Sequence, residues 1–213
     1  MIRFAIYFLL LSITGLAPAA NAERIPNDLF DTIQSKAKEI YANKGVGYNG
    51  NDCDWDYLTP DREYFYIYNQ VYKFDETSFY AFGCSYGAYN FWQVWLREEL
   101  NSDFTPIYFE YPEIEYYSSD NSDEMDRSRV TGMTIVGSLC NTTIDETEWT
   151  IRTDCKGRGL GDINATGFWK YIDNEFVLQY YDDDNTLDLK KNPIRIYYND
   201  TGKRYSDIFT SKN

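Results

Sequence analysis

The stretch TSFYAFGC at Thr77–Cys84 decides the fold predicted for this chain. It follows YFYIYNQVYKF at Tyr64–Phe74, and only Asp75 and Glu76 separate the two runs. Both runs alternate in part and are dense in aromatic side chains, which suit pleated, half-buried surfaces better than helices. Two short acidic residues between such runs are typical of a turn. The sequence therefore predicts a β-hairpin over residues 64–84.

Further apolar and aromatic runs predict more strands. The turn signal Asp173-Asn174 separates Gly167–Ile172 from Glu175–Tyr181 and predicts a second hairpin. Tyr89–Arg97 fits either a strand or a short helix, and we interpret it as a strand. The remaining strands are predicted at residues 105–109, 113–117, 130–139, 148–154 and 194–198. Because aromatic residues make up 18% of the chain, the expected class is α+β, mostly antiparallel β.

An amphipathic helix is predicted over residues 27–43, packed on one face of the sheet. Asn27 is a candidate N-cap. Apolar residues recur there at three- and four-residue steps, at Leu29, Phe30, Ile33, Ala37, Ile40 and Tyr41. We expect a single β-rich domain over residues 23–213, with the helix and a linker at 23–50 and the sheet at 51–213.

Residues 1–22 have the layout of a secretory signal peptide. Arg3 gives a positive start, Phe4–Ile13 is apolar, and Ala20-Asn21-Ala22 is a small-residue end. No later stretch approaches the roughly 20 apolar residues needed to span a bilayer. We therefore expect an exported protein, periplasmic or extracellular, with no membrane insertion after the signal is cleaved.

The four cysteines predict disulfides, because their number is even and the chain carries an export signal. Three pairings are open. We favour Cys53 with Cys84 and Cys140 with Cys155, since each pair flanks a predicted hairpin. A metal site needs closer, paired spacing, and histidine is absent from the chain, so neither a metal nor another cofactor is predicted.

The candidate binding site is a glycine-rich run between two predicted strands, which we call the glycine segment: Lys156-Gly157-Arg158-Gly159-Leu160-Gly161-Asp162. Three glycines in five positions allow backbone angles that are closed to residues with a Cβ. We expect a tight projecting loop that displays Arg158, whose planar fork of donors suits a carboxylate or a phosphate. The alternative is purely structural: the glycines let the strand turn, and Arg158 pairs with an acid of its own fold.

Charge and residue usage narrow the function classes. A net charge of −14 disfavours nucleic acid and anionic membranes as partners, since both are polyanions, whereas a cationic partner is easier to accommodate. Gly83-Cys84-Ser85-Tyr86-Gly87 has the spacing of a nucleophile elbow, but the absence of histidine removes Ser-His-Asp and Cys-His catalysis. Paired carboxylates stay open, because 34 acidic residues make some such pair inevitable.

Two motifs resemble those of a known family. The first is Cys84-Ser85-Tyr86-Gly87-Ala88-Tyr89-Asn90, and the second is the glycine segment, followed by Trp169 and Phe176-Val177-Leu178. They look like the signatures of a bacterial exported family that is catalogued as domain of unknown function 1176. The resemblance implies export and a β-rich fold, and it brings no catalytic residues. That family often has a cysteine where this chain has Ile163, so its disulfide arrangement does not transfer.

The Gly-Arg-Gly run is also similar to the loop that bacterial periplasmic inhibitors of invertebrate-type lysozymes insert into the enzyme cleft. By that resemblance Arg158 would pair with catalytic carboxylates, and the acidic surface would steer a cationic enzyme toward it. Lys156 stands where that inhibitor loop has a serine. The preferred function is a non-enzymatic periplasmic or secreted binding module, whose partner at Arg158 is a cationic protein or an anionic envelope ligand. The alternatives are a lysozyme inhibitor and a carboxylate-dependent hydrolase of envelope polysaccharide.

Overall fold

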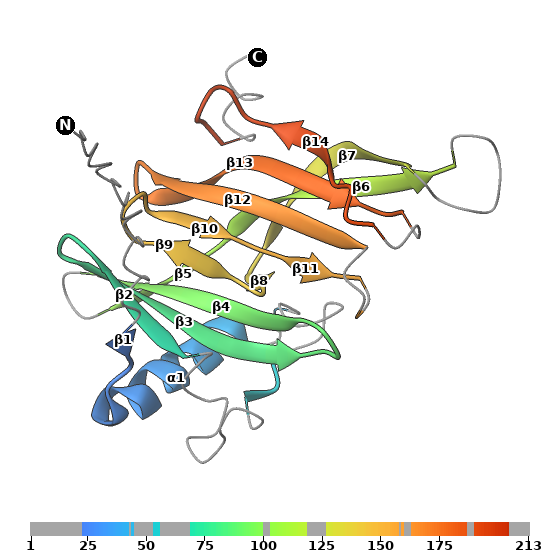
Figure 1. The fold of residues 1–213 in the computed structure, drawn as a ribbon. Coiled ribbons are helices and arrows are strands. Elements are labelled where there is room, and N and C mark those ends of the chain that lie inside the picture. The colour runs from blue at the N-terminus through green and yellow to red at the C-terminus, as the bar shows by residue number, and fades with distance from the viewer. Residues whose placement is uncertain are drawn as a thin grey trace, which may run out of the picture.

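A helix and two β-sheets form successive layers, and a two-stranded ribbon lies beside the second sheet (Figure 1). The computed structural model describes residues 23–42, 44, 53–55, 69–99, 103–118, 127–157, 159, 163–186 and 190–204. All strand pairs among these residues are antiparallel. The predicted mostly antiparallel β class is therefore confirmed.

The first sheet contains the predicted aromatic hairpin. Its strands, in spatial order, are β1 (Glu23–Arg24), β2 (Gln70–Phe74), β3 (Thr77–Tyr86), β4 (Phe91–Glu98) and β5 (Phe104–Ile107), and β8 (Ser138–Cys140) also pairs with β4. Asp75 takes a left-handed conformation, with φ of 50°, in the turn between β2 and β3. Residues 64–68 of the predicted first strand lie outside the described residues. The strand interpretation of residues 89–97 agrees with β4.

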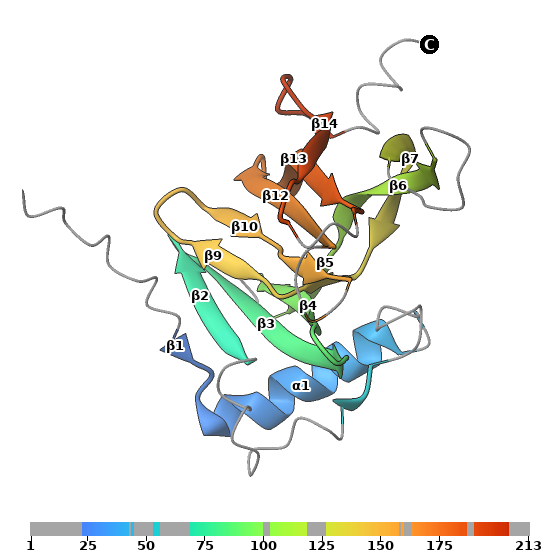
Figure 2. The ribbon, with the colours of Figure 1, turned by 45° about the vertical axis from the view of Figure 1, so that its right-hand side comes forward.

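Both faces of the first sheet are covered, which explains why β3 is almost continuously apolar. Tyr80 and Phe82 pack in one core cluster with the helix α1 (Asn27–Tyr41), while Phe79 and Ala81 pack in the other with the second sheet. This alternation follows from the two-residue period of a strand. Figure 2 shows α1 lying across the outer face of β3 and β4.

The second sheet holds the other predicted hairpin. Its order is β14 (Ile194–Tyr198), β13 (Glu175–Asp184), β12 (Asn164–Ile172), β10 (Thr150–Arg152) and β9 (Thr143–Asp145), with β11 (Cys155–Lys156) also paired to β12. Asp173 and Asn174 join β12 to β13 with φ angles of 50° and 68°. Left-handed angles at both central residues match the twist of a tight two-residue hairpin.

The ribbon corrects two predicted boundaries. β6 (Phe109–Tyr117) runs through Pro112 as one strand and pairs with β7 (Arg127–Val136), where the sequence predicted a break. A proline fits there because β6 pairs on one side only within the described ribbon, so its other edge needs no donor. The strand predicted at residues 130–139 is divided at Gly137, and its halves β7 and β8 belong to different sheets.

Both favoured cysteine pairings are confirmed. The Cα atoms are 4.4 Å apart in Cys53–Cys84 and 5.6 Å apart in Cys140–Cys155. The second bond joins β8 of the first sheet to β11 of the second sheet. It therefore ties the two layers together directly before the glycine segment. Within the described residues, no helix has the length and apolar character needed to cross a membrane.

Candidate functional site

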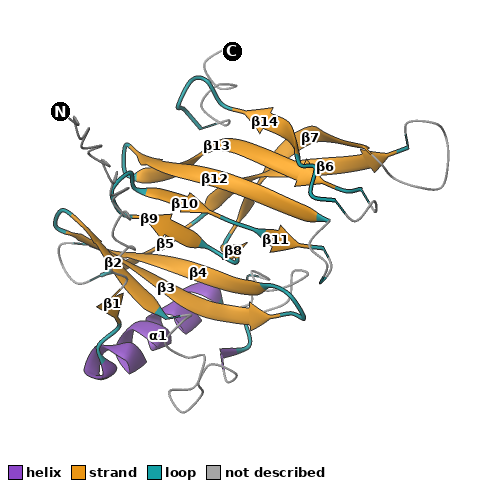
Figure 3. Cartoon of the chain, viewed as in Figure 1, coloured by secondary structure: helices purple, strands orange, loops and turns teal. Residues whose placement is uncertain are grey.

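The glycine segment begins at the end of β11, a strand of the second sheet (Figure 3). Lys156 is the last residue of β11, and it is exposed, as are Gly157 and Gly159. Arg158, Leu160, Gly161 and Asp162 lie outside the described residues. The expectation that Arg158 projects outward, and its alternative of an internal ion pair, both stay predictions.

Gly157 and Gly159 both lie close to the side chains of other elements. Gly157 has no positive φ, so close approach replaces the reason predicted for that glycine. A Cβ at Gly157 would overlap the side chain of Ile163, and a Cβ at Gly159 would lie 2.5 Å from Cε1 of Tyr89. The amide of Gly157 donates to the carbonyl of Ile163 at 2.9 Å, so the ends of the segment are joined. A side chain at either position would push these neighbours apart.

The two motifs that the sequence analysis singled out meet in space. The side-chain amide of Asn90 donates to the Lys156 carbonyl at 2.7 Å, and its oxygen accepts from the Lys156 amide at 2.7 Å. Asn141 donates to the Asn90 oxygen and to the Asp154 carbonyl, both at 2.8 Å. The turn after β3 is thereby fastened to the start of the glycine segment. Asn141 was missed by the sequence analysis, although its place next to Cys140 could have drawn attention to it.

An exposed aromatic surface borders this junction. Tyr86 and Tyr89 are 54% and 53% exposed, and Tyr89 packs directly against Gly159. Tyrosines that expose this much ring are enriched at protein contact surfaces, where one end of the side chain is apolar and the other can donate a hydrogen bond. The surface next to the glycine segment is therefore chemically suited to contact with another molecule.

A cavity of about 330 Å³ opens beside the base of the segment, at Cys155, Lys156 and Gly157. We call it the tyrosine pocket and define it by Lys156, Asn164, Tyr111, Tyr116, Tyr181 and Asp183. Pro112, Ile114 and Tyr116, which follow one another at steps of two along β6, line the pocket together with Tyr111. The bulge of the ribbon lies on β7, where Thr131 is the extra residue opposite the step from Glu113 to Ile114. The hydroxyls of Tyr111 and Tyr181 hydrogen-bond to each other.

Asp183 is the electrostatic centre of this pocket. Its residue is 4% exposed, its Oδ1 accepts from the Tyr116 hydroxyl at 3.4 Å, and its buried Oδ2 has no hydrogen-bond partner. Burial raises the pKa of this carboxyl, while hydrogen bonds from Ser128 and Tyr116 act the other way and the charge of Asp184 adds to the rise. Burial also raises the pKa of Tyr111, Tyr116 and Tyr181, so these phenols stay neutral.

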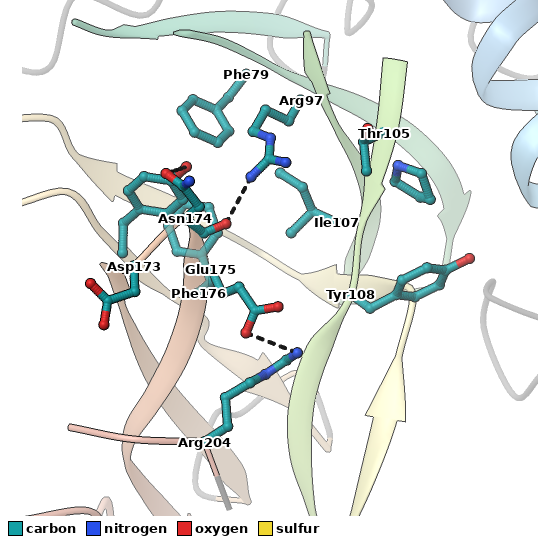
Figure 4. Close-up of a pocket in the computed structure, with 12 residues that line it drawn as sticks. Phe79, Arg97, Thr105, Ile107, Tyr108, Asp173, Asn174, Glu175, Phe176 and Arg204 are labelled. Carbon is teal, nitrogen blue, oxygen red and sulfur yellow. Dashed lines mark hydrogen bonds and ion pairs between the residues drawn. The ribbon is translucent and has the colours of Figure 1, made fainter. Parts of the chain in front are cut away.

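A second cavity, of about 260 Å³, lies between β4, β5 and the β12–β13 hairpin (Figure 4). Two guanidinium groups flank it, and both have partners. Arg97 donates to Glu99 at 2.6 Å and to the carbonyl of Asn174 at 2.8 Å, and Arg204 pairs with Glu175 at 3.0 Å. These bonds join the first sheet and the C-terminal residues to the hairpin. The arrangement helps to hold the two sheets together. Because both guanidinium groups have partners within the chain, whereas Asp183 Oδ2 has none, the tyrosine pocket is the stronger candidate for binding.

Comparisons with protein-family models, with curated proteins and with solved structures found no match for this chain. The resemblance to the exported family in the two motifs therefore stays a prediction from those residues.

Proposed function

We propose that this chain is an exported, non-enzymatic binding protein that contacts its partner through the glycine segment. The observation that carries the proposal is the reciprocal pair of hydrogen bonds between Asn90 and Lys156. Together with the Cys140–Cys155 bond, they hold one end of the segment on two different sheets. Cys155 and Lys156, held in this way, keep little conformational freedom to lose on binding, which favours affinity.

Arg158 is the residue proposed to make the principal contact. It stands between two glycines at which a Cβ would meet the side chain of Ile163 or of Tyr89. A guanidinium presents parallel donors that match the two oxygens of a carboxylate or phosphate. The partner would therefore carry an anionic group, either on an envelope component or in the cleft of a cationic enzyme such as a lysozyme.

The test compares the exported protein with two variants, Arg158→Ala and Arg152→Ala. Arg152 is an exposed arginine on β10, three residues before Cys155, so its removal changes the net charge equally outside the segment. Binding is measured against isolated anionic envelope polymers and against invertebrate-type lysozymes, together with the lytic rates of those enzymes. We expect one of these partners to bind the wild type and the Arg152 variant but to bind the Arg158 variant at least tenfold more weakly.

The same assays separate the three functions. Slower lysis in the presence of the wild type, restored by Arg158→Ala, would identify the lysozyme inhibitor. Cell-wall degradation by the protein alone would support the hydrolase and contradict a purely binding role. Equal binding by the wild type and both variants would refute the part assigned to the glycine segment.

A further inference from the structure

The tyrosine pocket contains a buried acid whose hydrogen-bonding needs the chain itself does not meet. Its neighbour Asp184 shows the contrast, because it is buried to a similar degree and accepts bonds from the amide and hydroxyl of Thr186 and from the amide of Asn192. Asp183 accepts hydrogen bonds from the hydroxyls of Tyr116, at 3.4 Å, and Ser128, but its Oδ2 has no partner. A buried acceptor without a partner destabilises the folded state, and does so more strongly when it is charged.

No cation of the described chain supplies the missing partner. Lys156 lines the same cavity, but it is exposed and forms no ion pair with Asp183. The nearest strand partners of Asp183 are Ala165 on β12 and Ile194 on β14, both apolar. The other polar groups around the cavity are neutral phenols and the amide of Asn164. A positively charged group from outside is the complement that this arrangement lacks.

The details of the pocket favour a primary ammonium group over a guanidinium. A guanidinium binds a carboxylate best through two parallel bonds, and one Asp183 oxygen already accepts from Tyr116. An ammonium needs one oxygen and is also attracted to the faces of tyrosine rings. The cavity of about 330 Å³ is within the roughly 300–1,000 Å³ range of small-ligand sites and can hold an alkyl chain behind such a group.

We propose that the tyrosine pocket binds an alkylammonium group, namely the side chain of a lysine on the partner that contacts the glycine segment. The pocket itself follows from the residues above, whereas the choice of a protein partner rests on the proposed function. The pocket and the segment share Lys156 and Gly157 in their walls, so one partner can reach both. The partner surface would then present a lysine close to an acidic group, and the acidic chain would attract the lysine before contact.

The experiment titrates the exported protein with Nα-acetyl-lysine N-methylamide and follows backbone amide NMR shifts. The norleucine analogue has the same capped backbone and alkyl side chain without the ammonium group, and the arginine analogue carries a guanidinium. We expect saturable shifts on β6 and β13, with a dissociation constant on the order of 1–10 mM for the lysine compound. The norleucine and arginine compounds should bind at least tenfold more weakly.

Variants assign the effect to the pocket. Asp183→Asn should weaken lysine binding about tenfold, whereas Asp182→Asn, which removes the same charge from a residue paired with Arg195, should change it by less than about twofold. Lys156→Gln should strengthen binding, because it removes a repelling charge, and this gain cannot arise from misfolding. Equal affinity for the lysine and norleucine compounds, tighter binding of the arginine compound, or no loss in the Asp183 variant would each overturn the proposal.

The titration with the lysine compound tests the tyrosine pocket independently of the proposed function. Binding of the compound together with an Arg158 variant that still binds its partner fully would refute the role of the glycine segment and keep the pocket. Loss of partner binding in the Arg158 variant, without binding of the lysine compound to the wild type, would support the glycine segment and refute the pocket.

Discussion

Gly167 is the position where packing of the second sheet excludes any side chain. A Cβ there would overlap the ring of Trp169, which is fully buried and donates from Nε1 to the carbonyl of Glu110 at 2.9 Å. We expect Gly167→Ala to lower the free energy of unfolding by about 1–3 kcal/mol, because the ring cannot move without breaking that bond. Urea unfolding measures the change.

Gly132→Ala is the matched control for this substitution. Its Cβ would lie 2.6 Å from Oε2 of Glu113, the end of an exposed side chain that can rotate away. The free energy of unfolding should therefore change by no more than about 0.5 kcal/mol. If the two variants lost equal stability, the interpretation of Gly167 would be wrong.

Asp183 should make a pH-dependent contribution to stability. Its pKa is raised above the ordinary 3.8 chiefly by burial, so the folded protein holds this proton more tightly than the unfolded chain. The stabilisation by the neutral carboxyl is complete below pH 3.8 and is lost as the pH rises through the folded-state pKa. The groups facing it are Tyr116 and Ser128 from the ribbon, and Asp184 follows it on β13.

Asp183→Asn removes this titration and keeps the shape of the side chain. The free energy of unfolding of the variant, minus that of the wild type, should therefore increase between pH 3 and pH 7, by about 1.4 kcal/mol for each unit of pKa elevation. Urea unfolding at several pH values gives this difference. If the free energy of unfolding of the variant minus that of the wild type stayed constant or fell with pH, the fold would not raise the pKa of Asp183.

The turn between β3 and β4 and the start of the glycine segment behave as one structural element through Asn90. Asn90→Ala removes both 2.7 Å bonds to the main chain of Lys156 and should cost about 1–3 kcal/mol of stability. Hydrogen exchange at the Lys156 amide should become faster. Asn90→Asp keeps the acceptor and should show a smaller effect on that amide, and unchanged exchange in the alanine variant would contradict the link.

Tyr41 joins the layers of the whole molecule. Its buried hydroxyl donates to the carbonyl of Trp95 at 2.7 Å and also lies 3.3 Å from that of Ile107, so the helix is bonded to β4 and β5. Tyr41→Phe should lower the free energy of unfolding by about 1–2 kcal/mol, since it leaves a buried carbonyl without this donor. Thermal unfolding tests this, with Tyr198→Phe as the control because Tyr198 is 66% exposed. Equal losses in both variants would exclude a structural role for the Tyr41 hydroxyl.

Several features of this molecule were determined by the sequence itself, because they depend on neighbouring residues. Alternation and short polar turns are local signals, so the hairpins at Asp75-Glu76 and Asp173-Asn174 were predicted correctly. The cysteine pairing followed for the same reason, since each bond closes a short segment, with separations of 31 and 15 residues. The glycine segment was also recognised locally, although Gly157 serves close approach to Ile163 rather than a positive φ.

The tyrosine pocket was decided only by the tertiary structure. Tyr111 and Tyr181 are 70 residues apart, and Asn90 and Lys156 are 66 apart, so no local pattern relates them. A two-residue period says which side chains of one strand share a face, but Tyr111 lines the pocket together with Pro112, Ile114 and Tyr116, so the period alone does not select the lining. Which strands then face each other depends on how the ribbon packs against β13, and this is set by the fit of whole surfaces rather than by adjacent residues.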